Sequence, residues 1–146
     1  MTTNSKAFFV AGEPKGQPRP RAFSRGGHAR VYDPGTAEGW KSQIAIAAKE
    51  YLPTKPIAGP VYLSIRFYMK RPKSHFFTGK RAGILRDNAR LPFVAKPDID
   101  NLCKAVMDAL KTLGMFSDDA KVWSLSALKM YATGPQATGA NIEISY

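Results

Sequence analysis

Residues 96–122 read KPDIDNLCKAVMDALKTLGMFSDDAKV, and this stretch predicts a helix followed closely by a strand. An apolar stripe at three- and four-residue spacing runs along Asp98–Leu113 and consists of Leu102, Val106, Ala109, Leu110 and Leu113. Pro97 interrupts the chain just before this helix, and Gly114 is well placed to end it. Lys121–Ala132 then alternates as a strand does, with Trp123, Leu125 and Ala127 on one side and Val122, Ser124 and Ser126 on the other.

The sequence on either side predicts further strands at Lys6–Val10, Pro60–Met69 and Ala140–Tyr146. A second helix is expected from Thr36, with Gly35 or Thr36 as its cap, to just before Pro53. Its apolar face consists of Trp40, Ile44, Ala47, Ala48 and Tyr51. The resulting order is strand, helix, strand, helix, strand, strand. This order predicts one α+β domain over residues 1–146, with a mixed sheet and two main helices.

Two long segments between these elements are expected to be loops because they are rich in proline and glycine. Gly12–Gly35 contains one extended piece near Ala29–Tyr32, and Lys70–Pro97 has room for one short helix. Loops of this length in a compact domain are usually functional or disordered. Both segments are also rich in Lys and Arg.

The composition limits the classes of function. The chain has 146 residues, 44% of them hydrophobic, which is enough for one folded core. One cysteine and two distant histidines argue against a disulfide framework and against a Cys- or His-based metal site. We expect a cytoplasmic protein without a signal peptide and without a membrane partner, since no apolar run is long enough to span a bilayer.

The charge indicates a polyanionic partner. With 22 Lys and Arg against 11 Asp and Glu, the net charge is +11, and such a field attracts nucleic acid. The basic residues are spread along the chain, but five of the 11 acids lie between Asp98 and Asp119. Carboxylates repel phosphates unless a divalent cation lies between them. This distribution therefore favours a metal-dependent site over a pure binding surface.

The acidic residues fall into two pairs and one helical row. Asp98 and Asp100 are two residues apart at the start of the helix, where both can face one cation. Asp100, Lys104 and Asp108 follow one another at four-residue spacing on a polar face. Asp118-Asp119 comes after the helix, so a straight helix would place this pair at its far end. The pair returns toward the first one if the chain doubles back, or if two subunits share the site.

Ordinary structural roles also explain these acids. Asp at a helix start is a normal N-cap, Asp118-Asp119 is a common turn signal, and Lys104 can join Asp100 and Asp108 in a surface ion-pair ladder. An EF-hand calcium loop does not fit, because Leu102 would occupy a ligand position. Spacing alone does not choose between these roles and metal chemistry.

The pattern from Pro97 to Val122 resembles the signature of the RusA family of Holliday junction resolvases. The resemblance rests on Pro97-Asp98-Ile99-Asp100-Asn101-Leu102, Lys104, Asp108-Ala109-Leu110 and Asp118-Asp119-Ala120-Lys121-Val122. Weaker similarity covers Arg71–Phe76 and Pro14–Arg21. The family consists of small, homodimeric, Mg²⁺-dependent endonucleases of bacteria and their viruses.

The resemblance implies a role for each matching residue. The three essential acids of the family fall on Asp98, Asp100 and Asp119, and its essential lysine falls on Lys104. Asp118 matches a less critical acid, and Asn101 matches a structural residue. The expected activity is resolution of four-way DNA junctions by paired symmetric nicks in recombination and repair.

The residue chemistry is compatible with this activity. Asp98, Asp100 and Asp119 would hold Mg²⁺, with Mn²⁺ as a substitute, and Lys104 would stabilise charge on the phosphate or leaving group. The basic loops would bind the DNA backbone; the candidates are Arg19, Arg21, Arg25, Lys73 and Lys96.

Two alternatives remain open at this stage. One is a non-catalytic nucleic-acid-binding protein, in which the acids only cap and turn and in which aromatic side chains stack on bases. The candidate aromatics are Phe8, Phe9, Phe67, Tyr68, Phe76 and Phe77. The other is an interaction protein whose charge only keeps it in solution.

Overall fold

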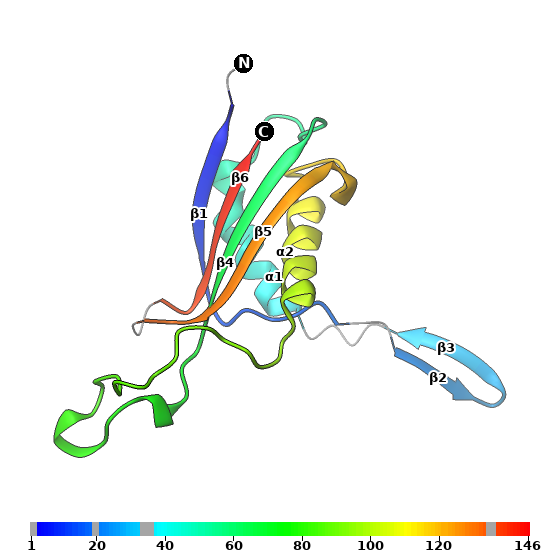
Figure 1. The fold of residues 1–146 in the computed structure, drawn as a ribbon. Coiled ribbons are helices and arrows are strands. Elements are labelled where there is room, and N and C mark those ends of the chain that lie inside the picture. Colours follow the sequence, from blue (N-terminus) through cyan, green and yellow to red (C-terminus); the bar gives the residue numbers. More distant parts are fainter. Residues whose placement is uncertain (1–2, 19–20, 33–36, 134–136) are drawn as a thin grey trace.

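A four-stranded mixed sheet forms the centre of the computed structural model, which describes residues 3–18, 21–32, 37–133 and 137–146. Its strand order is β1 (Ser5–Ala11), β6 (Gly139–Ser145), β4 (Val61–Met69) and β5 (Val122–Tyr131). β4 and β5 run parallel, whereas β6 is antiparallel to both of its neighbours. The predicted α+β class with a mixed sheet is confirmed, as are all four predicted strands of this sheet (Figure 1).

Both helices, α1 (Glu38–Ala48) and α2 (Ile99–Leu113), lie on the same face of the sheet (Figure 1). The alternation of β4 explains this arrangement, because every second side chain of the strand is buried under the helices. α1 ends at Ala48 and a short 3₁₀ turn, η1 (Lys49–Tyr51), follows it, so the helical segment ends before Pro53 as predicted. The expected caps Gly35 and Thr36 lie outside the described residues. Within the described part of the chain, no helix is long and apolar enough to cross a bilayer.

α2 has the predicted boundaries. Asp98 is its N-cap in extended conformation, and Gly114 ends it with φ +96°, a value that favours glycine. The predicted stripe is buried except for Leu113, which is half-buried. After Gly114 the chain turns back through buried Met115 and Phe116, and Met115 accepts a backbone hydrogen bond from Ile57. The chain therefore doubles back directly after α2.

The first long segment departs from its prediction as a loop. β2 (Arg21–Arg25) and β3 (His28–Tyr32) form a separate antiparallel hairpin, of which only an extended piece near β3 was expected. Gly26 and Gly27 connect them with φ +60° and +81°, the left-handed pair of a type I′ turn. The Gly-Gly dipeptide was the available signal, but it stood among so many prolines and glycines that the segment suggested a loop.

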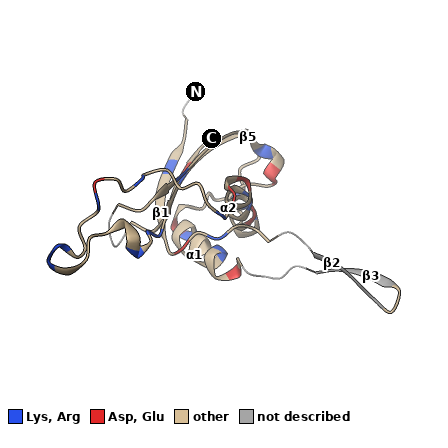
Figure 2. Ribbon diagram, turned by 60° about the horizontal axis from the view of Figure 1, so that its bottom comes forward, with Lys and Arg blue, Asp and Glu red and all other residues tan. Residues whose placement is uncertain are grey.

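The second long segment, residues 70–97, is ordered as an arm. It contains two 3₁₀ turns, η2 (Lys73–His75) and η3 (Gly79–Arg81), where one short helix was expected. Arg71 fixes the base of the arm, because its guanidinium donates to the carbonyl oxygens of Ala132 (2.6 Å) and Arg90 (2.9 Å). Arg71 also lies over the Tyr131 ring. Figures 1 and 2 show the arm and the β2–β3 hairpin projecting on either side of the start of α2.

The close packing of β1 against Gly139 predicts a large loss of folding stability when this glycine is replaced. This residue has φ +152°, and an added Cβ would collide with the Val10 carbonyl oxygen and lie 2.7 Å from Phe9 Cζ. We expect Gly139→Ala to lower the free energy of unfolding by about 3 kcal/mol, measured by urea denaturation. Gly59→Ala is the matched control, because nothing lies within 4 Å of its added Cβ. Equal stability of the two variants would contradict this account of the β1–β6 pairing.

Candidate active site

Asp98 is the N-cap of α2, but its side chain makes no capping hydrogen bond. Its Oδ2 instead accepts a hydrogen bond from Lys96 Nζ at 2.9 Å, and 46% of the side chain is exposed. A purely capping Asp would bond to a backbone N–H in the first turn. The Asp98 carboxylate therefore does not cap α2 through its side chain but pairs with Lys96.

Asp100 lies exposed in the first turn of α2, and its Oδ1 accepts a hydrogen bond from the Asn101 backbone N–H at 2.9 Å. Burial, with a smaller effect from the nearby Asp100 charge, raises the pKa of Cys103 to about 11. The Cys103 thiol is therefore protonated and inert at neutral pH, because the thiolate is the reactive form. The carboxylates, and not the cysteine, are therefore the candidate functional groups at the start of α2.

Lys104 joins α2 to the second acidic pair within one chain. Its Nζ lies 3.0 Å from Asp119 Oδ2, at the start of the 3₁₀ turn η4 (Asp119–Lys121). The hydrogen bond and charge of Asp119 raise the pKa of Lys104, and Asp108 and Asp118 add to the effect. Lys104 is thus a cation at neutral pH. The doubling back after Gly114 delivers Asp119 to the side of α2, which the sequence left undecided.

The carboxylate of Asp119 is only partly hydrogen-bonded within the described residues. Its Oδ1 is buried and has no hydrogen-bond partner among the residues that the structure describes. An unpaired buried carboxylate oxygen is costly, so its presence indicates a missing partner. A hard cation or a water held by one would satisfy it.

The remaining two acids have structural roles. Asp118 Oδ1 accepts a hydrogen bond from the Ala120 N–H at 3.2 Å, and chiefly this bond, together with Lys111, lowers its pKa. The turn role considered for Asp118 is thus confirmed. Asp108 Oδ2 pairs with Lys41 Nζ of α1 at 2.7 Å. Lys104 and Asp108, two members of the ion-pair ladder considered for α2, therefore each pair with a residue of another element.

The three predicted metal ligands are not gathered into one cluster. In residues 3–18, 21–32, 37–133 and 137–146, no three His, Cys, Asp or Glu side chains lie close enough together to hold an ion. Asp98 and Asp100 share the start of α2, while Asp119 is paired with Lys104. The donor set fits Mg²⁺ or Mn²⁺ nevertheless, because it consists of carboxylate oxygens and includes the unpaired Oδ1 of Asp119.

Two further segments position the start of α2. The Gln17 N–H donates to the Asn101 carbonyl oxygen at 2.9 Å, and a Cβ on Gly16 would lie 3.1 Å from Asn101 Cβ. Lys129 Nζ donates to the carbonyl oxygens of Ala95 (2.8 Å) and Pro97 (2.9 Å). Sequence reasoning missed Lys129, because a lysine within a strand carries no signal of this distant contact.

The predicted DNA-binding residues lie in both projecting segments. Lys73 is exposed in the arm, and Lys96 ends the arm at Asp98. Arg21 and Arg25 belong to β2, whose backbone pairing is described but whose side chains are not. Arg19 lies outside the described residues.

The family model described as "Endodeoxyribonuclease RusA" matches residues 11–145. The chain belongs to the RusA family. The RusA resemblance predicted from Pro97–Val122 is thus confirmed over nearly the whole chain. The chain is also 35% identical over 129 residues to the uncharacterized protein YqaN of Bacillus subtilis (strain 168), covering 88% of this chain and 89% of YqaN.

RusA-family membership makes the protein an endodeoxyribonuclease of the Holliday junction resolvase type, which hydrolyses phosphodiester bonds. Nucleases of this family depend on divalent metal ions and act on branched DNA. The non-catalytic alternatives are therefore wrong. The base-stacking role considered for Phe8 and Phe67 is also wrong, because both side chains are buried in the core.

Proposed function

We propose that this RusA-family enzyme resolves four-way DNA junctions by paired symmetric nicks, with Mg²⁺ as its metal, in recombination and repair. The observation that carries this proposal is the 3.0 Å contact between Lys104 and Asp119, because it brings the second acidic pair of the family motif to the helix that bears Asp98 and Asp100. We also propose that the protein acts in the cytoplasm and that residues 1–146 form a single domain.

We assign the metal to Asp98, Asp100 and Asp119. When bound, Mg²⁺ or its substitute Mn²⁺ supplies an activated water and neutralises phosphoryl charge. Lys104 holds Asp119 in place and presents ammonium protons to the phosphate or the leaving oxygen. Lys96 contacts the Asp98 carboxylate directly, and Lys129 positions the preceding residue, Pro97, through its carbonyl oxygen.

DNA binding is assigned to the two projecting segments. The arm carries Lys73 and leads to Lys96, and the hairpin side carries Arg19, Arg21 and Arg25. Because the segments flank the start of α2, a DNA strand held by both would pass the carboxylates (Figure 1). Phosphate contacts of this kind give an affinity that falls steeply with salt.

A synthetic four-way junction tests the activity directly. Incubated with Mg²⁺, the protein should cut two strands at symmetric positions, and EDTA should prevent cutting without preventing binding. Denaturing gels that follow each labelled strand separately measure both cuts. Binding without a nick under any divalent ion would overturn the proposal.

A homodimer would present two sites to a two-fold junction. β5 supports it, because it is an edge strand whose exposed apolar side chains include Trp123, 72% exposed. Among the described residues, only the bridge between Pro92 and Met130 pairs with its outer side. An open apolar edge strand is self-complementary and is normally covered. We therefore place a second copy of this chain on β5.

A lysine on this edge should separate the subunits. We expect Trp123→Lys to raise the dimer dissociation constant about tenfold or more, because it removes apolar contact area and brings one added charge from each subunit into the proposed interface. Ile46→Lys is the matched control, since Ile46 on α1 is similarly exposed at 69%. Light scattering over a dilution series measures both. A monomeric wild type, or a Trp123→Lys variant as dimeric as the control, would contradict this interface.

A further inference from the structure

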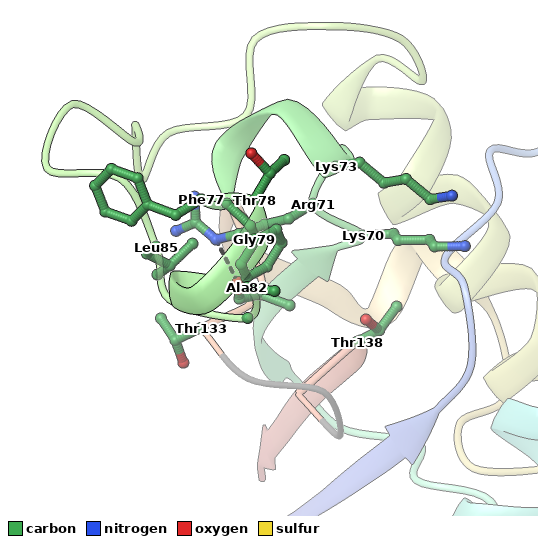
Figure 3. A pocket seen from close by; sticks show the side chains of 13 residues that line it. Lys70, Arg71, Lys73, Phe77, Thr78, Gly79, Ala82, Leu85, Thr133 and Thr138 are labelled. Carbon is green, nitrogen blue, oxygen red and sulfur yellow. Dashed lines mark hydrogen bonds between the residues drawn. The ribbon is translucent and has the colours of Figure 1, made fainter.

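The arm borders an open pocket of about 740 Å³, whose other side consists of Ala132 and Thr133, just after β5, and Thr138, just before β6 (Figure 3). This volume is typical of sites that bind small molecules. The walls are apolar and include Phe76, Phe77 and Leu85, and hydroxyl groups come from Thr78, Thr133 and Thr138. Figure 3 shows Lys70 and Lys73 extending side by side from one end of the pocket. The pocket thus combines an apolar interior with two cations.

The pocket is preformed by contacts within the arm. Phe76 and Leu85 form an antiparallel bridge, and the Phe77 N–H donates to the Ile84 carbonyl oxygen at 2.9 Å. Arg71 lines the pocket too, but its guanidinium is occupied by backbone carbonyl oxygens at the base of the arm. Little ordering would therefore be needed when a ligand enters.

The cations of the pocket are available for a ligand. In the described part of the chain, neither the Lys70 nor the Lys73 ammonium group forms a hydrogen bond or ion pair, and both residues are exposed. Between residues 70 and 96 the arm carries eight Lys and Arg against the single acid Asp87. This charge favours an anionic ligand over a cationic or neutral one.

The walls favour an aromatic ligand. The rings of Phe76 and Phe77 line the pocket. The Arg81 and Arg86 guanidinium groups, 3.7 Å and 5.1 Å from the centre of the Phe77 ring, already pack on Phe77, so we assign the stacking surface to Phe76. Aromatic rings and guanidinium planes are the surfaces on which proteins stack unpaired bases. A nucleotide combines a flat base with a phosphate, so it matches both the walls and the two lysines.

We propose that this pocket binds an unpaired nucleotide at the branch point of the DNA substrate, with its base against Phe76 and Leu85 and its phosphate on Lys70 and Lys73. The inference rests on the proposed function, because two strands of a four-way junction pass from one duplex into another at the crossover, where stacking is interrupted and a base can be unpaired and drawn into a pocket. The arm ends at Lys96, which pairs with Asp98, so one segment of the chain joins the pocket to the start of α2.

Photocrosslinking tests this placement with the wild-type protein in EDTA. A four-way junction with 5-iodouracil at the crossover should form an adduct on the peptide that contains Phe76 and Phe77. The same base placed within a duplex arm of the junction should give at least tenfold less adduct. Mass spectrometry of the digested complex identifies the peptide. Adducts that map elsewhere from both positions would overturn the proposal.

A pocket-filling variant supplies a second test. Ala82 lines the pocket and is exposed, so Ala82→Trp occupies the space without removing a core side chain. We expect about tenfold weaker binding of the junction, loss of the adduct and unchanged binding of linear duplex. Asn88→Trp is the control, because Asn88 is exposed on the same arm and does not line the pocket. Thermal melting confirms that both variants fold.

The outcomes separate the pocket from the activity. If the wild type neither binds nor cuts junctions, the proposed function fails. If it cuts them and Ala82→Trp binds and cuts as well as Asn88→Trp, only the pocket assignment fails. If deoxyadenosine monophosphate alone binds in an Ala82→Trp-sensitive manner while crosslinks to the junction map elsewhere, the pocket serves free nucleotides and the branch-point assignment is overturned.

Discussion

The Asp100→Asn variant should bind a four-way junction at least as tightly as the wild type and should cut it about a thousandfold more slowly, or not at all. The amide keeps the size of the side chain but removes the charge that a divalent cation requires. Removal of a negative charge that faces phosphate also reduces repulsion, so binding is retained or tightened. Because Asp100 is exposed, the change leaves the core intact.

Single-turnover cleavage in Mg²⁺ and gel-shift binding in EDTA measure the two effects separately. Asp87→Asn is the matched control, because it removes the same charge from an exposed position outside the motif. That control should cut at the rate of the wild type. Parallel loss of binding and cleavage in Asp100→Asn would contradict the role assigned to Asp100.

The Lys104→Ala variant should lose turnover by about a hundredfold with much less loss of affinity. The ammonium group both holds Asp119 at 3.0 Å and provides positive charge for the phosphate, and charge stabilisation of this kind contributes more in the transition state than in the bound state. Lys111→Ala on the same helix is the control, since Lys111 is exposed in the last turn. Wild-type turnover in Lys104→Ala would refute the role.

The pH dependence gives a further check on Lys104. Because Asp119 raises the pKa of Lys104 above its ordinary value of 10.5, the ammonium form persists below that raised pKa and is lost only as pH rises through it. The ratio of wild-type to Lys104→Ala turnover should therefore stay constant from neutral to mildly alkaline pH. A ratio that falls in this range would show that Lys104 deprotonates there.

The parts of the fold that sequence reasoning predicted well depend on local signals. α2 is an example, because periodicity, Pro97 and Gly114 all lie within or next to the helix and agree with one another. The β2–β3 hairpin was missed because its signal, Gly26-Gly27, lies in a segment of weak apolar alternation. The same distinction between local and distant signals applies to the site.

Asp98 and Asp100 could be paired from sequence because both lie at one helix start. The place of Asp119 could not, because it depends on the backbone contacts of Met115 and Ser117 with Ile57, which is distant in the chain. The support that Lys129 gives to Pro97 is equally non-local. A site that is assembled by such non-local contacts can be recognised only in the folded structure.

The most direct test of the proposed metal centre is a crystal of the assembled protein soaked in Mn²⁺ and measured for anomalous scattering. We predict an anomalous peak bounded by the carboxylates of Asp98, Asp100 and Asp119, with the Oδ1 of Asp119 among its ligands. A map with no peak among these three side chains, with the three carboxylates still apart, would contradict the assignment.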